Sequence, residues 1–237
     1  MNKPFKFKQF TINQDQCAMK IGTDAVLLGA LAPISHNPFS VLDIGAGTGI
    51  LSLMLAQRSN TQVIDALEID DDAYEQCVDN FEKSPWGDRL FCYHASLEEF
   101  NEEIEDVYDL IICNPPFYSE DFKTESVSRD IARFQDAMPF DQLVVSVAQL
   151  LSENGIFSVI LPFKEKDAFI ALAEHQKLKA NKITAIKGNP NSNFKRVVID
   201  FSFRESDITQ NELVIENERH DYTEDYFYLT KDFYLKM

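Results

Sequence analysis

Long apolar runs are absent from this sequence. No segment approaches the roughly 18 consecutive apolar residues that a membrane-spanning helix needs. The start, Met1–Phe10, alternates lysine and phenylalanine instead of carrying the apolar stretch of a signal peptide. We therefore expect a cytoplasmic protein with no membrane partner. Its 237 residues, 45% of them hydrophobic, suffice for one globular unit.

Cysteine is also scarce, and its spacing forms no pattern. The sequence has no Cys-x-x-Cys pair and no histidine cluster near a cysteine. This absence excludes the usual zinc sites and disulfide frameworks. We expect no bound metal, and reduced thiols at Cys17, Cys77, Cys92 and Cys113.

Positive charge is in short supply, with 22 lysines and arginines against 39 acidic residues and a net charge of −17. This balance argues against nonspecific nucleic-acid binding, which depends on basic residues that neutralise phosphates. Much of the acid, however, lies in two segments, Glu98–Asp109 with seven carboxylates and Glu216–Asp225. The basic residues gather elsewhere, at Lys3, Lys6 and Lys8, at Arg129 and Arg133, and at Lys187, Lys195 and Arg196. Each basic group could contact RNA or could equally be solvated surface.

From Phe39 onward, short β-rich apolar runs alternate with helical stretches. This pattern is typical of a Rossmann-like α/β fold, in which helices cover both faces of a mostly parallel sheet. The predicted parallel strands are Ser40–Ile44, Gln62–Glu68, Leu90–His94, Tyr108–Cys113 and Gly155–Leu161. The predicted helices between them are Ile50–Gln57, Asp71–Phe81, Leu97–Glu103 and Phe140–Leu151.

Two further β-like runs, Asn181–Ile186 and Arg196–Phe203, flank a Gly-Asn-Pro-Asn turn signal. We expect them to form an antiparallel hairpin at the sheet edge, which completes a seven-stranded sheet.

The first part of the chain precedes the sheet. A short helix is predicted over Thr23–Leu31, with Thr23 or Asp24 as the cap of its first turn. We interpret residues 1–37 as an extension that covers the active site, and residues 38–237 as the main domain.

A glycine-rich segment, Val-Leu-Asp-Ile-Gly-Ala-Gly-Thr-Gly-Ile, joins the first predicted strand to the helix after it. Gly45, Gly47 and Gly49 allow positive φ angles and a close approach of the backbone to a ligand. The dinucleotide pattern would place its third glycine where Ile50 stands, and Asp43 precedes the loop. This combination favours S-adenosylmethionine over NAD, with the three glycines and Asp43 as cofactor contacts.

Polar residues end the next two predicted strands. Glu68 stands nineteen residues after Gly49, the distance at which a carboxylate reaches the ribose hydroxyls of the cofactor. The alternative for Glu68 is a solvated strand end. After the third strand, Ser96 stands where such folds usually have an acid near the adenine ring, so we interpret it as a weaker cofactor contact.

The fourth predicted strand runs into Asn114-Pro115-Pro116-Phe117. The motif therefore lies at the carboxyl edge of the sheet, where open α/β sheets bind ligands. Each proline restricts the residue before it to extended conformations. The side-chain oxygen of Asn114 and the main-chain oxygen of Pro115 thus have fixed directions beside the cofactor.

Two fixed oxygen acceptors suit the methylation of a planar amine, whose lone pair is delocalised. They would take both N–H protons and hold the amine while it pyramidalises toward the methyl sulfonium, which together is worth on the order of several kcal/mol. Phe117 would stack on a flipped base and contribute ~1–3 kcal/mol. We predict Asn114, Pro115 and Phe117 as catalytic residues and Asn114 as a cofactor contact as well.

The polar stretch Tyr118–Ala137 is long for a connector and indicates a functional loop. Tyr118 is predicted to contact the substrate, and Arg129 and Arg133, at helical i,i+4 spacing, are candidate phosphate contacts. The two arginines could instead form surface salt bridges. Further substrate contacts are predicted at Lys195 and Arg196.

Four segments carry a family resemblance: Phe10–Leu31 with Met-Lys-Ile-Gly-Thr-Asp-Ala-Val-Leu-Leu-Gly, the glycine loop, Asn114–Tyr118 and the ending Asp232–Met237. Together they resemble the bacterial tRNA(Val) adenine-37 N6-methyltransferases over nearly the whole chain. The resemblance implies a class I fold that uses S-adenosylmethionine to methylate the 6-amino group of the adenine beside the anticodon of valine tRNA. It also implies that Thr23 and Asp24 help to enclose the cofactor. The departures are Ser96 and the strong acidity.

Other functions fit parts of the same pattern. The Asn-Pro-Pro-Phe motif can hold the 2-amino group of a guanine in ribosomal RNA or the side-chain amide of a protein glutamine, and a protein substrate would suit the net charge of −17. A non-enzyme alternative is an RNA-anchoring protein that has kept the cofactor pocket. A NAD-dependent oxidoreductase is disfavoured by Ile50 and by the lack of a well-placed catalytic Tyr-Lys pair or histidine. The residues indicate no oligomeric state.

Overall fold

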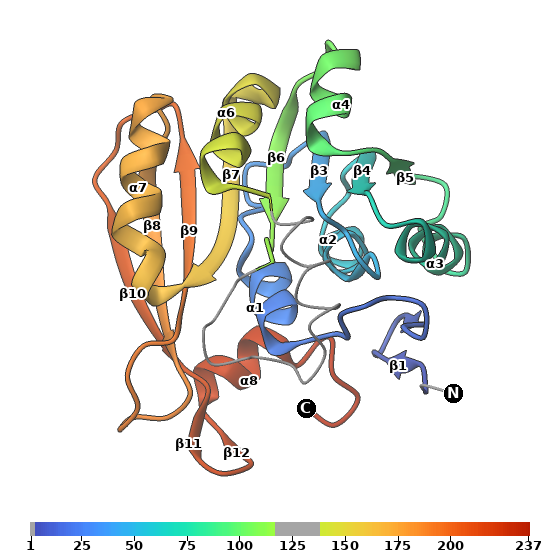
Figure 1. The fold of residues 1–237 in the computed structure, drawn as a ribbon. Coiled ribbons are helices and arrows are strands. Elements are labelled where there is room, and N and C mark those ends of the chain that lie inside the picture. The colour runs from blue at the N-terminus through green and yellow to red at the C-terminus, as the bar shows by residue number, and fades with distance from the viewer. Residues whose placement is uncertain (1–2, 117–137) are drawn as a thin grey trace, which may run out of the picture.

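The computed structural model describes residues 3–116 and 138–237 (Figure 1). The predicted substrate contacts Phe117, Tyr118, Arg129 and Arg133 lie outside this range. In the described part, the main sheet has eight strands in the order β10-β8-β9-β7-β6-β3-β4-β5. They are β3 Ser40–Ile44, β4 Val63–Glu68, β5 Leu90–His94, β6 Tyr108–Cys113, β7 Leu151–Pro162, β8 Lys179–Lys187, β9 Arg196–Ser202 and β10 Thr209–Val214.

The five strands from β7 to β5 run parallel, and all five were predicted. Their central members are apolar on both faces, because helices cover both sides of the sheet. Alternate residues of β3 serve two different cores: Val41 packs in one hydrophobic cluster and Leu42 in the other. The prediction of a mostly parallel α/β sheet is confirmed.

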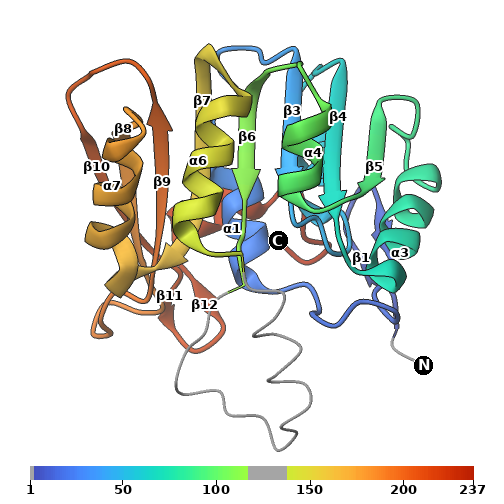
Figure 2. The same ribbon diagram turned by 45° about the horizontal axis from the view of Figure 1, so that its top comes forward.

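The helices form two layers on either side of the sheet (Figure 2). One layer consists of four helices that pack in the same hydrophobic core: α1 Thr23–Leu31, α2 Ile50–Arg58, α3 Asp71–Glu82 and α8 Glu224–Thr230. The other layer consists of three helices that pack in the second core: α4 Leu97–Glu103, α6 Phe140–Leu150 and α7 Lys166–His175. Helix α7 follows the short 3-10 turn η1 Phe163–Glu165. Among the helices described, none has the length and apolar character needed to cross a membrane.

The predicted hairpin exists, but it is not at the sheet edge. Strands β8 and β9 pair antiparallel, while β10 pairs parallel with the outer side of β8 as an eighth strand. The prediction of seven strands ending in this hairpin was therefore one strand short. Strand β10 reads Thr-Gln-Asn-Glu-Leu-Val and buries only Leu213, so it lacks the apolar alternation from which strands are predicted.

Helix α1 forms over the predicted range, but its predicted cap was wrong. The N-cap residue is Gly22, and no side chain makes a cap hydrogen bond. Thr23 and Asp24 instead lie within the first turn, where the carboxylate of Asp24 pairs with Arg196. The helix is apolar nearly all round because it packs against α2, α8 and the sheet.

Both chain ends lie on one side of the molecule (Figure 1). Strands β1 Phe5–Lys6 and β2 Thr11–Ile12 form a small antiparallel sheet, and Phe7 bridges to Tyr234. The ammonium of Lys8 donates to the main-chain oxygens of Lys231 and Met237 at 2.6 and 2.8 Å. A second small sheet, β11 Glu216–Glu218 with β12 Asp221–Tyr222, follows β10.

Candidate active site

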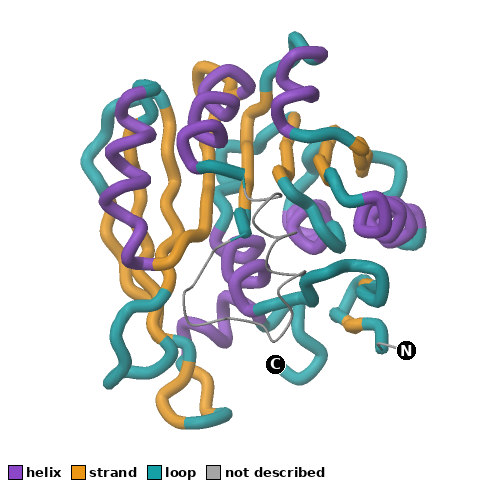
Figure 3. Tube along the Cα trace, in the orientation of Figure 1, coloured by secondary structure: helices purple, strands orange, loops and turns teal. Residues whose placement is uncertain are grey.

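The glycine loop lies between β3 and α2 at the carboxyl edge of the parallel strands, where Figure 3 shows loops gathered below the sheet. Gly45, Gly47 and Gly49 have φ angles of 73°, 55° and 77°, which confirms the predicted left-handed backbone. The amides of Gly45 and Ala46 both donate to the main-chain oxygen of Leu67 on β4. The loop is thus fixed to the neighbouring strand.

The three glycines serve two different purposes. A Cβ atom added at Gly45 or Gly47 would meet no described atom within 4 Å, so both positions face open space in which a ligand can approach the backbone. A Cβ atom at Gly49 would lie 2.5 Å from the ring of Phe81 and 2.9 Å from the sulfur of Cys77. Gly49 is therefore required for the packing of the loop against α3.

Glu68 ends β4 directly beside the glycine loop. One carboxylate oxygen accepts from the amide of Gly47 at 2.7 Å, and the other accepts from the amides of Ile69 and Asp70 at 2.9 and 3.0 Å. A carboxylate offers about four lone-pair sites, so these bonds leave capacity for one hydroxyl donor. Glu68 is 9% exposed and oriented by its neighbours, as a ligand-binding acid at a strand tip requires.

Asp43 lies beneath the loop and is fully buried. Its Oδ2 accepts from the hydroxyl and the amide of Ser52 at 2.7 and 3.1 Å, while Oδ1 has no hydrogen-bond partner among the described residues. Burial raises the pKa of Asp43 to about 7, against the lowering effect of the Ser52 hydrogen bonds. Its observed contact therefore supports the first turn of α2.

Two buried amide side chains on α3 were missed by the sequence analysis. Asn80 donates to the main-chain oxygens of Thr48 and Asn13 and accepts from the amide of Asn13. Gln76 accepts from the amide of Gln16 at 2.8 Å. The spacing of four residues between Gln76 and Asn80, on the helix face that also buries Cys77, is the signal that could have identified them.

These contacts bring the segment from Asn13 to Cys17 beside the glycine loop. The pKa of Cys17 rises to about 12, mainly through burial and then through the nearby carboxylates of Glu68, Asp70 and Asp15. The thiol therefore stays protonated. The early chain runs past the same strand tip that carries Glu68.

Asn114 follows β6 at the level of the glycine loop. Ile44 and Cys113 are register partners of the parallel pair β3 and β6, so the next residues, Gly45 and Asn114, leave the sheet side by side. Asn114 is half-buried and Pro115 is buried. The predicted position of the motif at the carboxyl edge beside the loop is confirmed, while the catalytic roles of Asn114 and Pro115 stay predictions.

The comparisons with known proteins agree with this geometry. The family described as methyltransferase small domain matches residues 18–138. The tRNA1(Val) (adenine(37)-N6)-methyltransferase of Flavobacterium johnsoniae is 63% identical over 98% of this chain and 100% of its own length. The protein of the same name from Flavobacterium psychrophilum is 61% identical over 98% of this chain and 100% of its own. This chain belongs to the tRNA1(Val) (adenine(37)-N6)-methyltransferase family. Membership confirms the resemblance noted in the sequence.

The fold of this family member is that of methyltransferases more widely. A predicted O-methyltransferase from Agrobacterium tumefaciens superposes with a TM-score of 0.67 at 17% identity, covering 89% of this chain and 96% of the other. At that identity the likeness concerns the fold alone. In the described residues, no three histidine, cysteine or acidic side chains are placed to hold a metal ion.

Two of the remaining predicted contacts, Ser96 and Arg196, have observed structural partners. The amide and hydroxyl of Ser96 bond to Glu99 at 3.0 and 2.8 Å, which forms the capping box of α4. The guanidinium of Arg196 contacts Asp24 at 2.7 Å, and Lys195 is exposed just before β9. Ligand contacts of these residues stay predictions.

Proposed function

We propose that this methyltransferase transfers a methyl group from S-adenosylmethionine to the 6-amino group of adenine 37 in a valine tRNA. The observation that carries the proposal is the pairing of Ile44 with Cys113, which sets Asn114 beside the glycine loop. The family's relatives, 63% and 61% identical over their whole length, carry this activity in their names. A tRNA substrate also favours a cytoplasmic location.

The loop and the strand tips suit the cofactor. Open space at Gly45 and Gly47 admits a ligand against the backbone, and the remaining acceptor capacity of Glu68 suits a ribose hydroxyl. Thr23, Asp24, Asp43, Ser96 and Asn114 are proposed as further contacts. When bound, S-adenosylmethionine supplies a methyl group on a positively charged sulfur.

Asn114 and Pro115 would hold the reacting amine. The side-chain oxygen of Asn114 and the main-chain oxygen of Pro115 accept its two N–H protons, and these bonds strengthen as positive charge develops on the nitrogen. No strong base is needed, because the proton leaves only after the methyl group has been transferred. The motif's fourth residue, Phe117, is proposed to stack on the base.

We interpret residues 1–37 as an extension over the active site of the main domain. The hydrogen bonds of Asn13 and Gln16 to α3 and the position of Cys17 near Glu68 support this interpretation. Tyr118, Arg129, Arg133, Lys195 and Arg196 are proposed to contact the RNA.

One of the two acid-rich segments, Glu98–Asp109, lies mostly away from the active edge. Helix α4 begins after the carboxyl end of β5 and returns toward the amino end of β6. The carboxylates at its far end, from Glu102 to Asp106, therefore lie at the edge of the sheet opposite Asn114. The second acid-rich segment, Glu216–Asp225, follows β10 and therefore lies at the same edge as Asn114.

The test is transfer of labelled methyl groups to tRNA that lacks the modification, followed by nucleoside analysis. We expect 6-methyladenosine in valine tRNA, and Asn114→Ala to lose most of the turnover while its affinity for S-adenosylmethionine changes little. Asn60→Ala, an exposed asparagine ahead of β4, is the matched control. Label in 2-methylguanosine or in protein would show that the substrate is a different one. Full activity of Asn114→Ala would show that Asn114 does not have the proposed role.

A further inference from the structure

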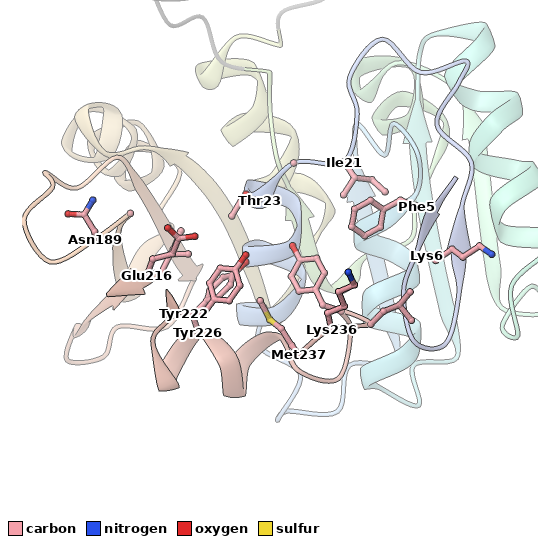
Figure 4. Close-up of a pocket in the computed structure, with 15 residues that line it drawn as sticks. Phe5, Lys6, Ile21, Thr23, Asn189, Glu216, Tyr222, Tyr226, Lys236 and Met237 are labelled. Atoms are coloured by element: carbon pink, nitrogen blue, oxygen red, sulfur yellow. The ribbon is translucent and has the colours of Figure 1, made fainter. Parts of the chain in front are cut away.

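A cavity of about 750 Å³ opens at the carboxyl edge of the sheet, apart from the glycine loop (Figure 4). Its wall includes Gly188 and Asn189 after β8, Ile215 and Glu216 after β10, and Thr23 at the start of α1. Strands β8 and β10 run in the direction of β6 and β7, since β8 and β7 are both antiparallel to β9. The cavity therefore opens at the same edge as Asn114.

The end of the cavity formed after β8 and β10 and the cofactor loop lie on opposite sides of Asn114. In the strand order, β6 stands between β3, which carries the loop, and the pair β8 and β10. Three strand spacings of about 4.8 Å each, or roughly 14 Å, separate β6 from β8. This distance is within the span of a few nucleotides of single-stranded RNA.

Aromatic rings form one wall of the cavity. Tyr226 is 3% exposed, and Tyr234 also lines the cavity. The ring of Tyr222 lies 5.2 Å from that of Tyr226, with an interplanar angle of 37°, and is 41% exposed. Tyr222 therefore offers a ring that is supported from within and accessible to a planar group, an arrangement suited to stacking.

The polar groups around the rings have the chemistry of base recognition. Asn189 carries an amide, Glu216 is the one acidic residue among those described in the cavity wall, and Lys236 adds an ammonium group, while the Lys6 side chain points away from the rings (Figure 4). A carboxylate accepts hydrogen bonds from an exocyclic amino group, and ammonium groups suit the neighbouring phosphates. The other acids of Glu216–Asp225 do not line the cavity.

We propose that this cavity binds a second unpaired nucleobase of the RNA substrate, a few nucleotides from the methylated adenine. The base stacks on Tyr222, and its exocyclic amino group donates to Glu216, so adenine, cytosine and guanine are accepted and uracil is disfavoured. Proteins that read single-stranded RNA combine stacking rings with such polar contacts. The proposal rests on the proposed function, because the occupant belongs to the same RNA.

The experiment compares Tyr222→Ala with Tyr228→Ala, an exposed tyrosine of the same region that does not line the cavity. We expect Tyr222→Ala to raise the dissociation constant for the tRNA about 5- to 150-fold, the equivalent of ~1–3 kcal/mol for one stacked base. The turnover at saturating tRNA and the affinity for S-adenosylmethionine should change little. Thermal unfolding checks that both variants fold.

A second measurement identifies the base. Anticodon stem-loops with one abasic nucleotide at a time are titrated against the wild type and Tyr222→Ala. At one position the abasic substitution should weaken binding to the wild type and have no effect on binding to the variant. Uracil placed there should weaken binding to the wild type, and Glu216→Gln should reduce that discrimination.

The two proposals fail in different ways. If the wild type methylates the tRNA but Tyr222→Ala binds it as tightly as Tyr228→Ala does, the cavity proposal is wrong and the proposed function stands. The cavity proposal is also wrong if every abasic position weakens binding to Tyr222→Ala as much as it weakens binding to the wild type. If the wild type methylates no RNA, the proposed function fails and the cavity proposal fails with it.

Discussion

The side-chain amide of Asn80 donates a hydrogen bond of 3.0 Å to the main-chain oxygen of Thr48, inside the glycine loop. The same amide group also satisfies both main-chain groups of Asn13. Because Asn80 is 1% exposed, water does not replace these bonds. One side chain of α3 therefore joins the loop that faces the cofactor to the early segment of the chain.

Asn80→Ala should weaken both the fold and the cofactor site. The change leaves the buried main-chain oxygen of Thr48 and the part-buried main-chain groups of Asn13 without this partner, at about 1–3 kcal/mol for a fully buried unsatisfied group. We expect a lower midpoint of thermal unfolding and weaker binding of S-adenosylmethionine, measured by calorimetric titration. Asn60→Ala should change neither quantity. Unchanged cofactor affinity in a destabilised Asn80→Ala would show that the bond serves the fold alone.

Glu68→Gln tests whether the strand-tip acid orients the cofactor loop. A glutamine has one oxygen in place of two, so its NH₂ group must face either the amide of Gly47 or those of Ile69 and Asp70. Losing one charged hydrogen bond costs about 1.5–3 kcal/mol, so the dissociation constant for S-adenosylmethionine should rise about 10- to 150-fold. Glu103→Gln, at the opposite edge, is the control. Equal cofactor affinity in both variants would show that the hydrogen bonds of Glu68 serve the fold of the loop alone.

Asp43 should make the free energy of unfolding depend on pH. Its pKa is about 7 in the folded protein and about 4 in the unfolded chain. The folded state thus binds the proton more tightly, so the stabilisation is fully present below pH ~4 and is lost as the pH rises through about 7. At about 1.4 kcal/mol per pKa unit, the loss is on the order of 4 kcal/mol.

Asp43→Asn provides the comparison, because the amide cannot titrate. We expect the difference in urea unfolding free energy between wild type and variant to fall between pH 4.5 and 7 and to stay constant above pH 8, on the order of one unit beyond the folded pKa. Asp200, whose pKa burial raises to about 6, titrates in both proteins and cancels in the difference. A pH-independent difference would contradict the raised pKa of Asp43.

The parallel strands could be predicted because each is marked by the apolar character of its own residues. Leu110–Cys113 is a continuous apolar run, and Val41–Ile44 is apolar except for Asp43, so both strands need burial on both faces. Strand β10 was missed because it is polar and depends on its pairing with β8. Helix α7 was also missed, since only Phe169 and Ala173 are buried in it.

The parts of the candidate site that depend on residues close together in the sequence could be predicted. Positive φ at the three glycines follows from the residue type alone. The bonds of Asn80 and Gln76 join residues 67 and 60 positions apart, and no local pattern in the sequence specifies such partners. The pairing of Asp24 with Arg196 spans 172 positions and replaces the predicted helix cap for the same reason.

Ser96 has an observed structural role that differs from its predicted role. Its place after the third strand predicts a cofactor contact, whereas in the structure its hydroxyl accepts from the amide of Glu99 and donates to the Glu99 carboxylate. Ser96→Ala should cost about 0.5–2 kcal/mol of stability, as the loss of an N-cap does. If the hydroxyl serves only the cap, the affinity for S-adenosylmethionine stays at the wild-type value. Ser96→Asp, which can still cap α4, should then restore the stability, whereas a fall in cofactor affinity with Ser96→Ala would restore the predicted contact.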